Sequence, residues 1–131
     1  MIVTDCSAIL EVLLQTDYAQ AVETRLFKAG ETLHAPHLID VEAAHVLRRY
    51  VLYQGLEEER ARQALEDLRD FPLRRHPHDI LLSRIWELRS NLSAYDAAYI
   101  ALAEALDALL LTRDGRLAKA PGHQARIEEI E

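Results

Sequence analysis

Four acidic residues, far apart in the sequence, occupy positions where an α/β fold would bring them together. They are Asp5, Glu42, Asp96 and Asp114. Asp5 ends the run 1–5 and Asp114 lies just beyond the apolar run 108–112, so both are expected at the exits of buried strands. Glu42 and Asp96 are expected in the opening turns of two helices. Ligands of open parallel sheets bind beyond the carboxyl ends of the strands, and all four acids would meet there.

Carboxylates that converge in this way constrain the chemistry. Without cations they repel one another, and each raises the pKa of its neighbours. A divalent metal ion relieves the repulsion, and carboxylate oxygens are ligands that Mg²⁺ prefers. The constellation therefore predicts a metal-dependent enzyme.

Each acid taken alone also has a purely structural explanation. Asp5 suits a turn after a strand, where its side chain would accept hydrogen bonds from backbone amides. Asp96 follows Ser93 at the spacing of a capping box, and Asp114 precedes a glycine in a turn. Glu42 borders an apolar helix stripe, where a carboxylate needs a partner. These explanations weaken in combination, because all four acids are assigned to one edge of one sheet.

The size and composition indicate one domain that spans residues 1–131. Half of the 131 residues are hydrophobic, which is enough for a single sizeable core. No apolar stretch approaches the roughly 18 residues needed to cross a bilayer, so no membrane association is expected. The N-terminus lacks the basic segment and cleavage site of a secretory signal. The single cysteine, Cys6, excludes an internal disulfide and fits a reducing cytoplasm.

The balance of charged residues limits the ways in which the chain could bind nucleic acid. Its net charge of −7 argues against non-specific wrapping of nucleic acid. RNA stays open as a substrate, because metal ions and a few local arginines can bind phosphates. Arg113 and Arg116 flank the last acid and are the candidates for such contacts, the alternative being surface salt bridges. The histidines lack a paired ligand spacing such as HExxH, so no zinc site is expected.

Alternating strands and helices would position these residues. Strands are expected over 1–5, 32–35, 71–76, 108–112 and 126–130. Helices are expected after Ser7, which suits an N-cap, and over 18–28, 38–53, 57–70, 79–89, 93–106 and 116–120. Pro72 restricts the third strand to a sheet edge or a strand end. This alternation predicts an α/β fold whose parallel sheet is covered by helices on both faces.

Four segments combine the acids with small and apolar residues in a fixed order. They are Val3 to Ser7, Ala35–Pro36 with Val41 to Ala44, Leu92 to Ala103, and Leu110 to Leu117. Together they resemble the PIN-domain nucleases, and specifically the ribonuclease toxins of VapBC toxin–antitoxin pairs. The resemblance spans nearly the whole chain. It implies a single PIN domain, a three-layer α/β/α sandwich whose central parallel sheet has the strand order 3-2-1-4-5.

The resemblance also implies roles for the acids. Those that match the family's acidic quartet are Asp5, Glu42, Asp96 and Asp114. The quartet would bind one or two Mg²⁺ or Mn²⁺ ions and hydrolyse RNA phosphodiester bonds. The expected direct ligands are Asp5 and Asp96, followed by Asp114. Glu42 would bind a second ion or orient the attacking water. Ser7 and Thr112 match the family's hydroxyl residues and would hold the carboxylates or metal-bound waters.

The partners are implied by the resemblance alone. Toxins of this kind pair as homodimers, and a VapB-like antitoxin silences them. The C-terminal segment of the antitoxin lies in the toxin's groove. Exposed apolar residues of the helices, such as Leu14, Phe27 and Tyr53, would supply interface area.

Other function classes need residues that this chain does not offer. A receiver-type phosphotransfer domain would need an acidic pair after the first strand and a well-placed lysine, whereas Asp5 is a single acid and Lys119 is poorly placed. A phosphatase of the haloacid dehalogenase type would need a second aspartate where Ser7 stands. The open alternative is a PIN-fold module that binds RNA or a protein partner without cleaving.

Overall fold

The five strands of the sheet are short and lie where the sequence predicts them. In the computed structural model, which describes residues 1–131, they are β1 (Ile2–Thr4), β2 (Leu33–Pro36), β3 (Leu73–His76), β4 (Leu109–Thr112) and β5 (Ile127–Glu129). All neighbouring strands pair in parallel, in the order β3-β2-β1-β4-β5. The predicted order is confirmed, and the strand that follows Pro72 is an edge strand.

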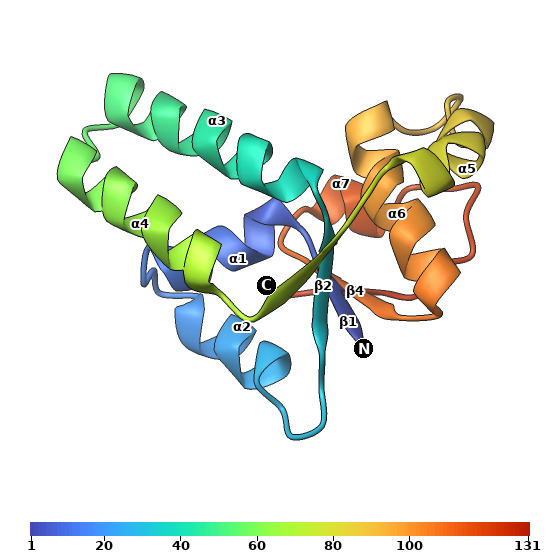
Figure 1. Cartoon of the computed structure of the whole chain (residues 1–131), viewed down its shortest axis with the longest axis horizontal. Coiled ribbons are helices and arrows are strands. Elements are labelled where there is room, and N and C mark those ends of the chain that lie inside the picture. The colour runs from blue at the N-terminus through green and yellow to red at the C-terminus, as the bar shows by residue number, and fades with distance from the viewer.

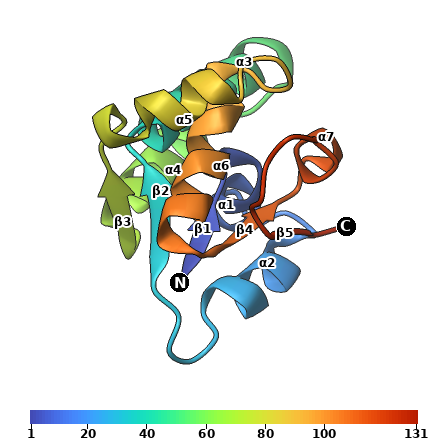
Figure 2. The same cartoon turned by 90° about the vertical axis from the view of Figure 1, so that its right-hand side faces the viewer.

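Helices cover both faces of this sheet and form the outer layers of a three-layer sandwich (Figures 1 and 2). They are α1 (Cys6–Leu13), α2 (Ala19–Leu26), α3 (Leu38–Tyr53), α4 (Glu58–Asp70), the short 3₁₀ helix η1 (Asp79–Leu81), α5 (Leu82–Glu87), α6 (Ala94–Leu106) and α7 (Gly115–Ala118). Helix α6 packs across β1, β2 and β4 on one face, and α5 packs against α6. Helices α1 and α3 pack on the other face, and α3 forms a hairpin with α4 that extends to one side of the sheet.

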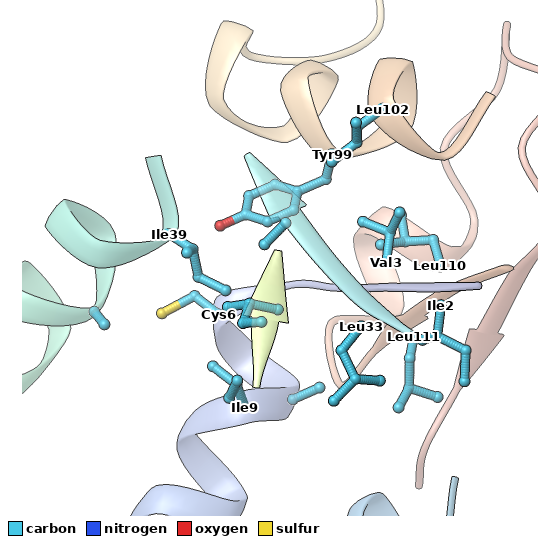
Figure 3. Close-up of a cluster of buried hydrophobic side chains, with 14 of the residues drawn as sticks. Ile2, Val3, Cys6, Ile9, Leu33, Ile39, Tyr99, Leu102, Leu110 and Leu111 are labelled. Atoms are coloured by element: carbon cyan, nitrogen blue, oxygen red, sulfur yellow. The ribbon is translucent and has the colours of Figure 1, made fainter. Parts of the chain in front are cut away.

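The core consists of apolar side chains that alternate between the two faces of the central strands. Ile2 and Leu111 lie on the α1 side of the sheet, while Val3 and Leu110 lie on the α6 side (Figure 3). All four are at most 1% exposed. Strands buried on both faces need such continuous apolar runs, and each fully buried leucine or isoleucine contributes about 1.5–3 kcal/mol.

The register of the sheet brings the strand exits together. Thr4 pairs with Leu111 across β1 and β4, and the backbone N–H of Asp5 donates to the carbonyl of Leu111 at 3.2 Å. Asp5 therefore leaves β1 beside Thr112, the last residue of β4. The expectation that the first and last acids meet at one sheet edge rests on this pairing.

Two local expectations are wrong. Asp5, and not Ser7, is the N-cap of α1, because its carboxylate accepts the N–H of Ala8 and the helix already begins at Cys6. The segment 79–89 does not form one helix but divides into η1 and α5. No helix of the chain is both long and apolar enough to cross a bilayer.

Candidate active site

Asp5 is the most buried of the four acids and is held from several sides. It is 5% exposed. Its Oδ1 accepts hydrogen bonds from the Ser7 hydroxyl at 2.7 Å and from the Ala8 backbone N–H at 3.0 Å. Its Oδ2 accepts a short hydrogen bond from the Thr112 hydroxyl. These contacts fix the carboxylate in one orientation at the exit of β1.

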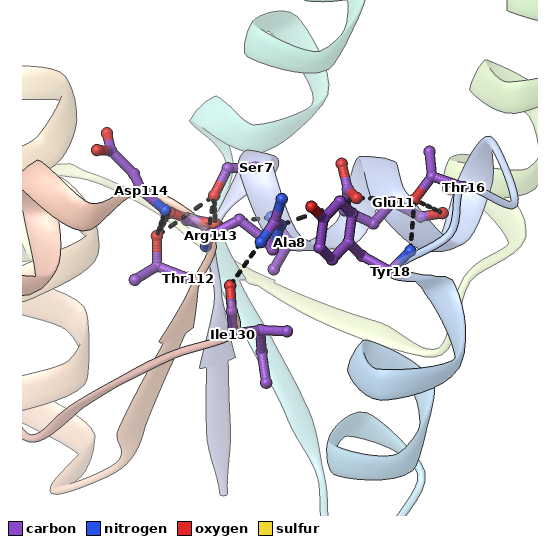
Figure 4. A network of polar contacts seen from close by, with 10 residues as sticks. Ser7, Ala8, Glu11, Thr16, Tyr18, Thr112, Arg113, Asp114 and Ile130 are labelled. Atoms are coloured by element: carbon purple, nitrogen blue, oxygen red, sulfur yellow. Dashed lines mark hydrogen bonds and ion pairs between the residues drawn. The ribbon is translucent and has the colours of Figure 1, made fainter.

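Ser7 and Thr112 link the exits of β1 and β4 into one network (Figure 4). Their hydroxyl oxygens are 3.3 Å apart. Each oxygen also accepts a backbone N–H from the turn after β4: that of Arg113 on Ser7, and that of Asp114 on Thr112, both at 2.9 Å. Both hydroxyl residues therefore contact Asp5 directly and also hold the backbone that carries the last acid.

Asp114 starts α7 as Asp5 starts α1. Its Oδ1 accepts the backbone N–H groups of Arg116 at 2.9 Å and Leu117 at 3.5 Å. The guanidinium of Arg116 lies 3.8 Å from the same oxygen. Asp114 thus caps the turn, as its structural explanation predicts. Capping does not exclude a role in the candidate site, because the capping position lies at the same sheet edge.

Glu42 and Asp96 reach this edge from helices. Glu42 is in α3, one turn after its start, and its Oε1 accepts a hydrogen bond from the Tyr99 hydroxyl at 2.6 Å. Asp96 is in the first turn of α6, and its backbone N–H donates to the N-cap Ser93 at 3.2 Å. Tyr99 and Asp96 belong to the same helix, so α6 contributes to the surroundings of both acids.

The four carboxylates share one electrostatic environment. Burial raises the pKa of Asp5 to about 6, against the hydrogen bonds of Thr112 and Ser7. Burial likewise raises the pKa of Glu42, and the charges of Asp5 and Asp96 raise it further. The pKa of Asp96 is raised by burial and by Asp114. The expected mutual influence of the acids is therefore present.

The donor chemistry and charge of this edge fit a hard divalent cation. No lysine or arginine nitrogen lies within 4.0 Å of Asp5, Glu42 or Asp96, so their negative charge lacks a cationic partner. The oxygens are of the type that Mg²⁺ and Mn²⁺ bind. No three His, Cys, Asp or Glu side chains of the chain stand close enough to hold an ion as they are placed. The acids thus fit a divalent ion in ligand type and charge, but their side chains are not arranged in a complete coordination site.

The two arginines beside the last acid lie in different places. The guanidinium of Arg113 lies 3.4 Å from the centre of the Tyr18 ring, and its Nη1 donates to the carbonyl of Ile130 at 2.8 Å. It points away from Asp114 (Figure 4), so its guanidinium is engaged by Tyr18 and Ile130 and not by the last acid. The Arg116 side chain is 95% exposed and stays beside Asp114.

A hollow of about 480 Å³ adjoins the acidic edge between the start of α6 and α7. Its lining includes Asp96, Asn91, Arg116 and Lys119. Sequence reasoning did not place Lys119 there, because Lys119 and Asp96 are far apart along the chain. A signal for Tyr99 was present: it follows Asp96 by three residues, which places the two side chains on adjacent positions of one helix face.

The comparisons with known proteins agree with this geometry. The family model described as the PIN domain matches residues 2–123. Ribonuclease VapC9 of Mycobacterium tuberculosis is 48% identical over 130 residues, which cover 99% of this chain and 98% of that protein. Ribonuclease VapC1 of the same species is 43% identical over 129 residues, which cover 98% and 96%. The chain belongs to the VapC ribonuclease family of PIN domains.

Solved structures of VapC proteins share the fold. VapBC2 of Rickettsia felis, bound to a DNA fragment from its promoter, superposes with a TM-score of 0.72 at 15% identity, covering 100% of both chains. VapC20 of Mycobacterium tuberculosis, described as a sarcin–ricin loop cleaving toxin, gives 0.68 at 16% identity and covers 90% of this chain and 93% of that chain. At these identities the likeness concerns the fold alone.

Proposed function

We propose that this VapC-family chain is a metal-dependent endoribonuclease toxin that hydrolyses RNA phosphodiester bonds. The observation that carries the proposal is the placement of Asp5, Glu42, Asp96 and Asp114 at one sheet edge. Burial and the charges of neighbouring acids raise the pKa of Asp5, Glu42 and Asp96, and none of these three forms an ion pair with a lysine or arginine. The ribonuclease names of relatives at 43–48% identity support the substrate class.

In the proposed mechanism, Asp5 and Asp96 would hold a Mg²⁺ or Mn²⁺ ion, together with Asp114. When bound, the ion would lower the pKa of a water molecule and neutralise charge on the phosphate. Ser7 and Thr112 keep the Asp5 carboxylate in one orientation. Because the Tyr99 hydroxyl donates to Oε1 of Glu42, Oε2 is the oxygen that would orient the attacking water or help to hold a second ion.

The hollow beside Asp96 is the proposed place of the RNA backbone next to the cleaved bond. Arg116 and Lys119 on its rim can each contact a phosphate oxygen, and the exposed guanidinium of Arg116 can form two hydrogen bonds at once. Arg113 has no part in this contact. The remainder of the acidic surface would repel RNA, so binding depends on this small cationic region and on the metal.

The test is cleavage of structured RNA by purified protein with Mg²⁺, with Mn²⁺ and with a chelator. Cleavage with the ions and none with the chelator is expected, together with growth arrest on expression. Binding of RNA without cleavage under every condition, and normal growth, would favour the alternative of a non-catalytic PIN-fold module.

A VapB-type antitoxin is the proposed protein partner. VapBC2 of Rickettsia felis is such a pair. An apolar hollow of about 530 Å³ lies between α3 and α4 and includes Leu47, Val51, Leu52 and Leu65. Leu52 and Leu65 are 53% and 37% exposed, which suits a groove that receives the apolar side of a partner helix. Co-expression with the cognate antitoxin should restore growth.

Homodimer formation is also part of the proposal. Exposed apolar side chains gather on η1, α5 and the start of α6, namely Ile80, Leu82, Trp86 and Tyr95. Such patches on soluble proteins mark interaction surfaces. Light scattering after gel filtration should give twice the mass of the 14.9 kDa chain. The cytoplasm is the proposed place of action, in accord with a free thiol at the buried Cys6.

A further inference from the structure

Tyr99 places a polar atom deep in the core, beside the proposed active site. The residue is 1% exposed, the largest of the fully buried side chains. Its ring lies among apolar neighbours on the α6 side of the sheet, and its hydroxyl points toward the first turn of α3, where Ile39 lies (Figure 3). Phenylalanine would fill the same apolar space, so packing alone does not account for the hydroxyl.

The hydroxyl has one partner, the Oε1 of Glu42 at 2.6 Å. A buried hydroxyl needs a hydrogen-bond partner, and bonds in which the acceptor is charged are the short and strong ones. For Glu42 the bond matters as much, because no lysine or arginine is paired with it and no other donor to its carboxylate is recorded. Tyr99 is therefore the one hydrogen-bond donor to the Glu42 carboxylate.

This bond joins two helices that carry different acids. Glu42 belongs to α3, whereas Tyr99 belongs to α6 and follows Asp96 by three residues, which is about one helical turn. Asp96 and Tyr99 therefore share one face of α6. The separation of Glu42 from Asp96 is thus fixed through the phenol.

We propose that Tyr99 is a positioning residue that holds Oε1 of Glu42, fixes the distance of this carboxylate from Asp96, and directs Oε2 into the site. The inference rests on the proposed metal-dependent cleavage. It assigns to a core tyrosine a role that neither the acidic quartet nor its hydroxyl neighbours perform.

The test is the variant Tyr99→Phe, which removes the hydroxyl and keeps the ring. We expect kcat for RNA cleavage and Mn²⁺ affinity in isothermal titration calorimetry each to fall about 10- to 100-fold, the effect of losing a group that orients a metal ligand. KM should stay within about twofold, because the phosphate contacts are unchanged. Unchanged kcat and Mn²⁺ affinity, with only a lower Tm in chelator, would show that Tyr99 is merely structural and overturn the inference.

Tyr50→Phe is the matched control. Tyr50 is half-buried in α3, packs against the same core, and its hydroxyl has no recorded hydrogen bond. This variant loses the same atom elsewhere, so its kcat and Mn²⁺ affinity should equal those of the wild type. An equal loss in both variants would contradict a specific role for Tyr99.

A double-mutant cycle separates positioning from an independent effect. If Tyr99 acts through Glu42, adding Tyr99→Phe to Glu42→Ala, which removes the acceptor, should lower kcat and Mn²⁺ affinity no further than Glu42→Ala alone. Losses that multiply would overturn the inference. A wild type that binds Mn²⁺ but cleaves no RNA would defeat the proposed function while the affinity measurements still decide on Tyr99; a wild type that does neither defeats both.

Discussion

At the scale of single residues, the local roles of the acids and their proposed chemistry coincide. Asp5 caps α1 and Asp114 caps α7, and both lie at the edge where the strands end. Capping positions expose a carboxylate to backbone N–H groups and to the positive end of the helix dipole. A capping position therefore holds the carboxylate in one orientation at the place where the proposed metal ion would bind.

Asp5→Asn is expected to abolish cleavage and to leave the fold intact. The asparagine oxygen can still accept the N–H of Ala8, while the buried charge is lost. Cleavage should fall at least about 100-fold, a loss typical for a group essential to metal or acid–base catalysis. RNA cleavage assays and circular dichroism melting in chelator measure the two effects. Full activity in this variant would contradict the assignment of Asp5 as a metal ligand.

At the scale of elements, β2 and β3 are joined by a histidine pair. His34 Nδ1 and His76 Nε2 are 2.9 Å apart, and the second nitrogen of His34 contacts the Thr32 hydroxyl at 2.8 Å. Burial lowers the pKa of His34, followed by the charge of His76, and burial also lowers that of His76, followed by His37. One of the two paired nitrogens donates a proton and the other accepts it, so this hydrogen bond forms between two neutral imidazoles.

The histidine pair predicts a pH dependence of stability. A histidine whose pKa is lower in the folded than in the unfolded state contributes stability above pH 6.5, its ordinary pKa, and this contribution is lost as the pH falls through the folded value. The contribution of the pair to the free energy of unfolding should therefore decrease from pH 7 to pH 5, whereas the raised pKa values of Asp5, Glu42 and Asp96 act in the opposite direction in wild type and variant alike. The difference in the free energy of unfolding between the wild type and His76→Asn, measured by urea titration, should therefore become smaller over this range. A difference that stays constant with pH would exclude a contribution of the pair.

Much of the element pattern could be predicted because it depends on local sequence. The bounds of α3 match the prediction over 38–53, since the apolar spacing is long and Gly55 with positive φ follows the helix. The cap of α1 could not be predicted, because Ser7 is also a good cap and only the pairing of β1 with β4 shows that its hydroxyl serves Asp5. The surroundings of Arg113 could not be predicted for the same reason, since its partners Tyr18 and Ile130 are distant in sequence.

At the scale of the whole molecule, a net charge of −7 leaves few places for a polyanion. The chain has two lysines: Lys119 borders the hollow beside Asp96, and Lys28 borders a different hollow together with Arg74, near the start of β3. This arrangement supplies a variant and a control of equal charge.

Arg116→Ala with Lys119→Ala should weaken RNA binding and its dependence on salt. In an Asp5→Asn background, which prevents cleavage, the slope of log K against log salt should fall by about 0.7 for each lost phosphate contact. Lys28→Ala with Arg74→Ala changes the net charge equally and should leave the slope unaltered. Equal effects of the two pairs would show that RNA binding senses overall charge and not the hollow beside Asp96.

The double use of Asp5, as helix cap and as proposed ligand, has a genetic consequence. Cells under selection for survival of the toxin can silence it by a change that keeps a capping oxygen, and such a chain stays folded. The proposed antitoxin groove between α3 and α4 would be unchanged, so such a chain would still bind the antitoxin. Such an inactive copy would bind antitoxin and leave less of it to inhibit an active toxin from a second gene. Its expression should therefore be harmless alone and harmful in cells that carry an active toxin–antitoxin pair.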